Sequence, residues 1–91
     1  MAQILVPTPL RKFTNNLSKV EVNGGTIVEN LKDLAVQFPD LEKYLFSGDE
    51  IKGYVKIFLG DNDIDSLNGA DTEVNTSDII SIIPAIAGGK N

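Results

Sequence analysis

The sequence contains no cysteine and no histidine. Their absence excludes disulfides, thiolate nucleophiles, imidazole bases, iron–sulfur clusters and nearly all zinc sites. Most enzyme chemistries need one of these groups and are excluded with them, and no bound metal or cofactor is expected.

Positive charge is also scarce. Eight Lys and Arg residues stand against thirteen Asp and Glu residues, which gives a formal net charge of -5, and the cations form no cluster. Affinity for nucleic acids rests largely on Lys and Arg neutralising phosphates, so no nucleic-acid partner is expected. We therefore expect this protein to bind other proteins and not nucleic acids.

Long apolar runs are missing as well. The most apolar segment, 79–83, is far too short to span a bilayer, and the first thirteen residues lack the basic and apolar regions of a secretory signal. We therefore expect no membrane anchor and a cytoplasmic location. A length of 91 residues suits one domain with a single core.

Periodicity in the first half predicts two strands and a helix. Residues 2–7 form a short apolar run and residues 17–22 alternate apolar and polar side chains with period two. This pattern predicts two strands joined by a loop that contains Pro7 and Pro9. Thr26 is placed to cap a helix, with Glu29 reaching back to the cap amide. The helix presents one apolar stripe before Pro39 ends it, formed by Ile27, Leu31, Leu34, Ala35 and Phe38. A second short helix is expected within residues 40–46.

The second half predicts three strands. Residues 48–53 form a polar loop, and the strand 54–59 points Val55, Ile57 and Leu59 to one face. Residues 60–63 form a turn, and a short strand follows over 64–67. The strand 79–84 has apolar residues on both faces, as a central strand requires.

This order of elements predicts an α+β domain in which one main helix packs across one face of a mixed sheet of four to five strands. The first and last strands pair in parallel, so that the chain leaves at the end of the sheet. We expect the domain to cover residues 1–84 and residues 85–91 to form a flexible C-terminal tail.

With these elements in place, the chain resembles the ubiquitin-like β-grasp sulfur carriers of the MoaD/ThiS family, and within it the carriers that serve cysteine biosynthesis. The resemblance covers nearly the whole chain and is carried by "PTPLRKFT", "TIVENLKDLAVQFP", "VKIFLGDNDI" and above all "SDIISIIPAIAGG". A Gly-Gly pair alone is weak evidence, whereas this ordered ending is specific.

The resemblance implies a protein co-substrate. A partner adenylyltransferase would activate the carboxylate of Gly89 with ATP, and sulfur would then displace AMP to leave a thiocarboxylate. Ala87, Gly88 and Gly89 would be the residues that the partner recognises. A cysteine synthase homologue, or another sulfur-accepting synthase, would receive the sulfur.

The tail chemistry accounts for these residue types. The six residues 84–89 span at most roughly 20 Å when extended, which is long enough to enter a deep cleft. Glycine has no Cβ, so Gly88 and Gly89 can pass through a channel that excludes side chains. The sulfur must come from another molecule, because the chain has no thiol.

Lys90 and Asn91 depart from the family pattern. While they are attached, Gly89 presents an amide, and its adenylation is impossible until the Gly89–Lys90 bond is cut. The resemblance implies a precursor that a JAMM-type zinc metalloprotease trims. The alternatives are that these two residues are not native or that the carrier has lost its function.

A partner patch is predicted next to the tail. Tyr54 and Phe58 alternate with inward residues and are expected on the sheet face away from the helix, beside Ile83. They form either a docking surface for the activating enzyme or a patch partly buried under loops.

Acidic residues are frequent in the loops of the second half. The segment 60–66 has the spacing of a calcium-binding loop, but Ser66 replaces its glycine and Thr72 its final glutamate, so a turn explains it better. The loop carboxylates are read as solvated charges that can steer the protein toward a basic partner cleft; they are Asp49, Glu50, Asp61, Asp63, Asp65 and Asp71.

Other functions stay open at this point. A ubiquitin-like modifier would join Gly89 to target lysines, and a sulfur donor could instead serve molybdopterin or thiamine synthesis. A β-grasp interaction domain with an inert tail is the third class.

Overall fold

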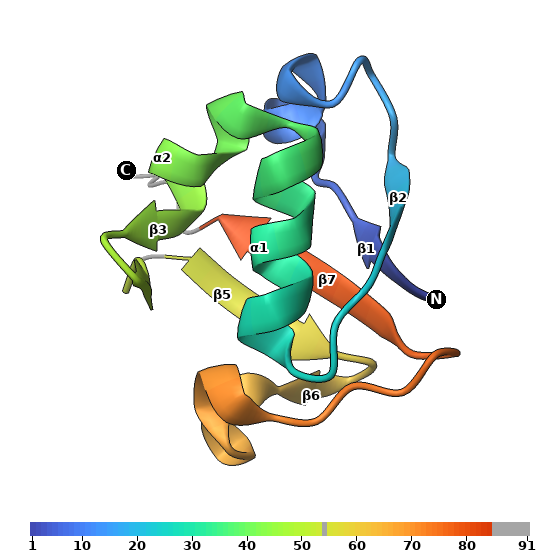
Figure 1. The fold of residues 1–91 in the computed structure, drawn as a ribbon, viewed down its shortest axis with the longest axis vertical. Helices are drawn as coiled ribbons and strands as arrows, with labels where there is room; N and C mark the ends of the chain where they lie inside the picture. Colours follow the sequence, from blue (N-terminus) through green and yellow to red (C-terminus); the bar gives the residue numbers. More distant parts are fainter. Residues whose placement is uncertain (54, 85–91) are drawn as a thin grey trace.

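A computed structural model of the chain describes residues 1–53 and 55–84. In this part of the chain a five-stranded mixed sheet has the order β2-β1-β7-β5-β6, and α1 (Ile27–Gln37) lies across one face (Figure 1). The strands are β1 (Ala2–Leu5), β2 (Lys19–Val22), β5 (Val55–Leu59), β6 (Asn62–Asp63) and β7 (Ile79–Pro84). This is the α+β architecture that the order of elements predicts.

Short elements surround the sheet. They are the 3-10 helices η1 (Thr8–Phe13), η2 (Pro39–Leu41), η3 (Ile64–Ser66) and η4 (Gly69–Asp71), the helix α2 (Glu42–Leu45), and a hairpin of β3 (Phe46–Ser47) and β4 (Glu50–Ile51). The second short helix is confirmed, and its Leu45 and the neighbouring Leu41 are fully buried.

Strand β7 occupies the centre of the sheet, as predicted. It pairs in parallel with β1 and antiparallel with β5, with Ile4 opposite Ile80 and Ile57 opposite Ile82. Both isoleucines of β7 that face α1 are buried, but Ile79 and Ile83 on the other face are 42% and 47% exposed. The apolar residues that the sequence places on both faces of this strand are therefore buried on one face only, because α1 covers only one face.

The start of α1 is capped almost as predicted. Thr26 Oγ1 accepts a hydrogen bond from the Glu29 amide at 3.3 Å. The Glu29 carboxylate accepts from the amide of Gly25 at 2.7 Å, one residue before the cap amide that the capping-box pattern indicates. Two otherwise unsatisfied donors at the helix start are still paired.

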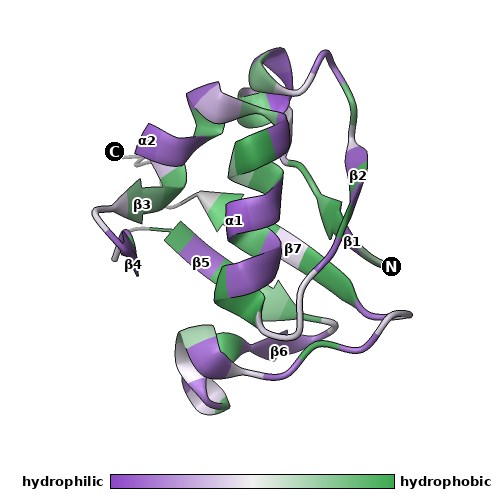
Figure 2. Cartoon of the chain, in the orientation of Figure 1, coloured by the Kyte–Doolittle hydropathy of each residue, from purple (hydrophilic) through white to green (hydrophobic). Residues whose placement is uncertain are grey.

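The apolar stripe of α1 packs on the sheet. Ile27, Leu31 and Leu34 are fully buried, and Ala35 and Phe38 contact the core while keeping part of their surface exposed. The helix ends at Gln37, two residues before Pro39. Figure 2 shows apolar residues along β1 and β7 in the middle of the sheet and alternating polar and apolar bands along α1.

Two segments of the second half differ from the sequence prediction. Residues 48–53 were expected to be a loop, but they include β4 and the tight turn of the β3–β4 hairpin, where Gly48 has φ of 65°. The expected strand over 64–67 is the 3-10 helix η3, and the strand is β6 just before it. Asp63 decides this, because its side chain accepts from the Asp65 amide at 2.9 Å and caps a turn.

The first loop also differs. Residues 8–13 form η1, and the chain turns back through Asn15 and Asn16, which have φ of 55° and 66°. Strand β2 therefore begins at Lys19, later than the predicted Leu17. Asparagine tolerates this left-handed conformation better than most residues. No helix in the described ranges is long and apolar enough to cross a membrane.

Candidate functional site

The chain reaches its C-terminal segment through the middle of the sheet. Pro84, the last residue of β7, pairs with Val55 at the start of β5. The predicted tail residues Ala87, Gly88, Gly89, Lys90 and Asn91 lie outside the described residues. What the structure does provide is the strand that precedes them, which pairs with β1 as far as Ser81 and with β5 as far as Pro84.

The sheet face away from α1 carries exposed apolar side chains close to this end of β7. We call the outer-face patch the set formed by Leu5, Phe58, Ile79 and Ile83. Leu5, Ile79 and Ile83 are exposed, and Phe58 keeps part of its surface accessible. The set spans three neighbouring strands, since β7 lies between β1 and β5.

The register places two of the three predicted patch residues together. Phe58 pairs with Ser81, which is two residues from Ile83, so the side chains of Phe58 and Ile83 are diagonal neighbours on one face. Tyr54 lies outside the described residues. Leu5 and Ile79 were missed, although the period-two alternation of their strands would place them on this face once Ile4 and Ile80 are assigned to the core.

A charged cluster borders the outer-face patch. Lys56 pairs directly with Ile83 and contacts two carboxylates, with its Nζ 3.2 Å from Asp65 Oδ2 and 3.9 Å from Asp63 Oδ2. All three side chains are partly exposed, so these ion pairs contribute little to stability. Their effect is to hold the Lys56 ammonium beside the carboxylates at the edge of the patch.

Across the described ranges, no group of three or more His, Cys, Asp and Glu side chains could hold a metal ion. Two of the acidic residues in the segment with calcium-loop spacing, Asp63 and Asp65, contact Lys56.

Comparison with known families gives a match over nearly the whole chain. The model of the ThiS family matches residues 4–89, so the match ends at Gly89 and leaves out Lys90 and Asn91. The matched range contains every strand and helix described above except the first two residues of β1.

Relatives and solved structures agree with this match. The sulfur carrier protein CysO of Mycobacterium tuberculosis is 28% identical over 89 residues, which cover 94% of this chain and 96% of that protein. CysO in the Amycolatopsis orientalis BexX/CysO complex superposes with a TM-score of 0.90 at 27% identity, covering 98% of this chain and 100% of that one. Small archaeal modifier protein 1 of Methanosarcina acetivorans gives a TM-score of 0.86 at 26% identity, with 97% and 95% of the two chains covered.

Proposed function

The chain belongs to the ThiS family, and from that membership we propose that it is a sulfur carrier whose working end is the carboxyl group of Gly89. The carrier is a protein co-substrate and leaves catalysis to its partners. The similarity to CysO favours cysteine biosynthesis as the destination of the sulfur.

This proposal is supported by the agreement between the residues that the family model matches and the strand order of the sheet. The match runs through β7 and stops at Gly89, and β7 is the central strand that leads directly to the tail. Residues 79–81 of β7 pair with β1 and residues 80–84 pair with β5, so the sheet defines the position from which the strand presents the following residues. The chain has no cysteine, so the sulfur must be supplied by another molecule.

The proposed chemistry has three steps. A protease, in the proposal a JAMM-type zinc enzyme, hydrolyses the Gly89–Lys90 amide, adding water to give the Gly89 carboxylate and the free dipeptide. An adenylyltransferase then joins this carboxylate to the AMP part of ATP with release of pyrophosphate. A sulfur nucleophile attacks the acyl carbon and displaces AMP, which leaves the thiocarboxylate at Gly89.

The adenylation step converts a poor electrophile into a good one. Hydroxide is a poor leaving group from a carboxylic acid, whereas AMP leaves readily from the mixed anhydride. The thiocarboxylate then supplies its sulfur as nucleophile to an activated amino-acid acceptor held by a cysteine synthase homologue. The role of this chain is to bring one reactive atom to several enzymes in turn.

The outer-face patch supports a docking role for the sheet. Three exposed apolar side chains lie on this face, Leu5 on β1 and Ile79 and Ile83 on β7 itself, and exposed apolar surface of this kind is typical of sites that bind protein partners. We assign this face to the adenylyltransferase. The Amycolatopsis CysO was solved in complex with another protein, BexX, which shows that a relative of this fold forms a stable assembly.

Mass spectrometry of the intact protein tests the proposed function. The chain is produced together with a candidate protease, adenylyltransferase and sulfur source, and its mass is compared with that of the chain produced alone. We expect loss of the Lys90–Asn91 dipeptide, followed by a gain equal to the difference between a sulfur and an oxygen atom. A Gly89→Pro variant is the control and should keep its full mass.

Other masses would assign a different role. A ladder of conjugates that depends on Gly89 would indicate a modifier that forms isopeptide bonds with lysines. An unchanged full-length mass in the presence of active partners would contradict the proposal.

A further inference from the structure

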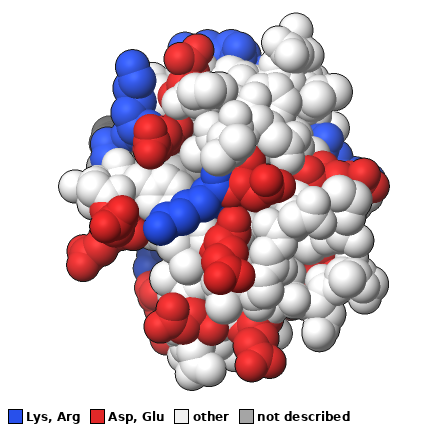
Figure 3. Space-filling view, viewed as in Figure 1, with Lys and Arg blue, Asp and Glu red and all other residues white. Residues whose placement is uncertain are grey.

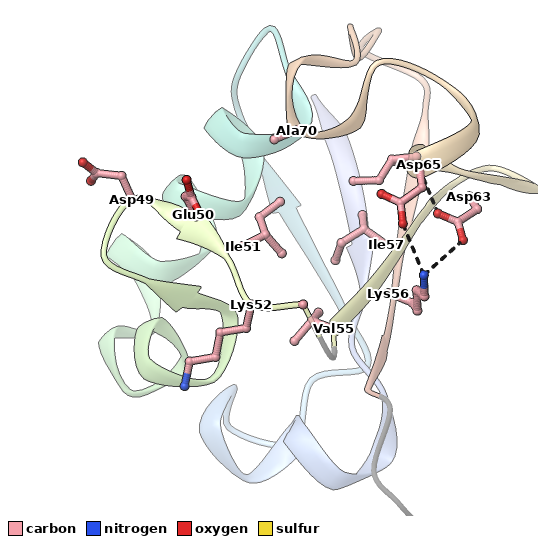
Figure 4. Close-up of a pocket in the computed structure, with 12 residues that line it drawn as sticks. Asp49, Glu50, Ile51, Lys52, Val55, Lys56, Ile57, Asp63, Asp65 and Ala70 are labelled. Carbon is pink, nitrogen blue, oxygen red and sulfur yellow. Dashed lines mark hydrogen bonds and ion pairs between the residues drawn. The ribbon is translucent and has the colours of Figure 1, made fainter.

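A second surface lies between the β3–β4 hairpin and the edge of the sheet, and it meets the outer-face patch at Lys56, Asp63 and Asp65. It is a cavity of about 390 Å³, a volume within the range of ligand-binding pockets. Figure 4 shows Ile51 of β4 and Ile57 of β5 pointing toward each other across it. We call it the edge groove; its lining comes from residues 49–53, 55–57, 63–65 and Ala70.

The floor of the edge groove is apolar. Val55, Ile57 and Ile64 line it and are buried, with exposures of 8%, 1% and 5%. Ile51 forms the opposite wall and packs against the core while part of its surface stays accessible. A side chain that entered the groove would therefore be surrounded by branched aliphatic groups.

One wall of the groove is an open sheet edge. Strand β6 pairs with β5 only at Phe58 and Leu59. Within the described part of the chain, residues 55–57 of β5 consequently have β7 as their one partner strand, and none lies on the groove side. The Val55 amide donates to the Lys52 carbonyl oxygen at 3.0 Å, so an added strand would use the other main-chain groups of this segment. An open edge of this kind is a template for an added strand, which gains main-chain hydrogen bonds.

The rim of the groove is acidic. Four carboxylates line it against two amines, and the Lys56 amine already contacts Asp63 and Asp65. Asp49 and Glu50 lie on the hairpin side, and in Figure 4 the Asp49 side chain points outward from the cavity. Figure 3 shows carboxylates gathered around the part of this face beside and below α1. Cationic side chains of a partner would therefore be attracted to the carboxylates on the hairpin side and to those beside β5.

Because side chains alternate along β5, the apolar and the charged side chains of this strand lie on opposite faces. Val55 and Ile57 point to the inner face with the apolar floor, whereas Lys56 points to the outer face, where Asp63 and Asp65 contact it. A strand added beside β5 would alternate in the same way. Its inward side chains would meet the isoleucines and its outward side chains would meet the carboxylates.

From this geometry we propose that the edge groove binds an extended segment of a protein partner in which apolar residues alternate with Lys or Arg. The segment pairs with residues 55–57, buries an aliphatic side chain against Ile51, Ile57 and Ile64, and places cations against the two acidic walls. The proposal rests on the groove alone and is independent of the chemistry at Gly89.

Synthetic peptides test the proposal with the full chain. The probe is Ac-Lys-Ile-Lys-Ile-Lys-NH2, and its binding is followed by NMR shifts of isoleucine methyl groups and by calorimetry at low salt. We expect the methyl groups of Ile51, Ile57 and Ile64 to shift, while those of Ile79 and Ile83 on the outer face stay unchanged. Added salt should weaken the binding.

Three control peptides separate the contributions. The peptide with Glu in place of Lys should not bind, because both the peptide and the rim of the groove would be negatively charged. The isomer Ac-Lys-Lys-Lys-Ile-Ile-NH2 should bind at least several-fold more weakly, because it lacks the alternation. N-methylation of the central residue removes its N–H donor and should weaken binding similarly if the segment pairs with the edge.

A charge-reversed protein provides the matched control on this chain. Asp49→Lys together with Glu50→Lys should weaken binding of the probe roughly tenfold through loss of rim attraction. Glu21→Lys together with Asp40→Lys changes the net charge equally at exposed sites outside the groove and should leave the affinity within about twofold.

Several results would overturn the proposal. Equal binding of the alternating peptide and its isomer would mean attraction by net charge alone. Methyl shifts confined to Ile79 and Ile83 would place the peptide on the outer-face patch, and no shift at millimolar peptide would mean that the groove does not take this class of segment. Unchanged isoleucine methyl positions in the charge-reversed proteins confirm that the folds being compared are the same.

Discussion

At the residue scale, Asn30 joins the start of α1 to the loop before it. The side chain is fully buried, and its Nδ2 donates to the carbonyl oxygens of Gly24 at 3.2 Å and Thr26 at 2.7 Å. Its Oδ1 has no hydrogen-bond partner in the part of the chain that the structure describes, which costs free energy relative to a paired amide. These hydrogen bonds hold the backbone of the loop close to the start of α1.

Gly24 is the residue that allows this approach. A Cβ at this position would lie 2.8 Å from both the Asn30 amide nitrogen and the Glu29 Cβ, closer than side chains tolerate. We expect Gly24→Ala to lower the free energy of unfolding by about 1–3 kcal/mol, because the loop must move away from α1. Urea unfolding followed by circular dichroism measures the change.

Gly53→Ala is the matched control for this prediction. A Cβ there has no atom within 4 Å, and the residue is not in the left-handed region. Its unfolding free energy should stay within about 0.5 kcal/mol of the parent value. Equal losses of unfolding free energy in Gly24→Ala and Gly53→Ala would show that close contact with α1 is not the reason for glycine at position 24.

At the element scale, β7 has two faces with different roles. Ile80 and Ile82 fill the core under α1, whereas Ile79 and Ile83 contribute to the outer-face patch. The same residue type at four of six positions thus supports stability on one face and offers a binding surface on the other.

This division predicts unequal effects of one substitution along the strand. Ile80→Ala should lower the free energy of unfolding by about 2–5 kcal/mol, because it leaves a cavity among fully buried neighbours. Ile79→Ala, its sequence neighbour on the other face, should cost less than about 1 kcal/mol. Chemical denaturation of both variants checks this, and similar losses would mean that the outer face is also packed.

At the scale of the whole molecule, the two proposed binding surfaces lie on one sheet. The outer-face patch lies over the central strands, and the edge groove lies at the side of β5 that β6 leaves unpaired. They meet at Lys56, which pairs with Ile83 of the patch and lines the groove together with its partners Asp63 and Asp65.

Docking through the outer-face patch predicts a specific loss of activation. In a chain ending at Gly89, Ile83→Asp should lower the kcat/KM for adenylation by its partner enzyme at least about tenfold, because a charge would be buried in an apolar interface. Pyrophosphate release measures the rate.

Val36→Asp is the control for the docking prediction. Val36 is 76% exposed on α1, so it is even more accessible than Ile83 but lies on the opposite side of the sheet. We expect kcat/KM within about twofold of the parent. Equal rates for the two variants would remove the outer-face patch from the docking surface.

The elements whose signals are local could be predicted from the sequence alone. The Thr26 cap, the apolar stripe of α1, the stop at Pro39 and the alternation of β5 depend on residues that are close together in the sequence, and all four are present in the structure. The ordered ending "SDIISIIPAIAGG" points to the Gly89 carboxylate through the family resemblance, and both that site and the boundary after Pro84 stay predictions.

The tertiary fold sets which surfaces those elements expose. The central place of β7 depends on its pairing with β1, which lies far away in the chain. The β3–β4 hairpin and the 3-10 helix at Ile64–Ser66 are local, and they form at the Gly48 turn and the Asp63 side chain where the sequence pattern predicts a loop and a strand. The exposed face of β7 follows from the single helix that covers the sheet. Strand periodicity shows that two faces exist, but long-range packing determines which of them meets solvent.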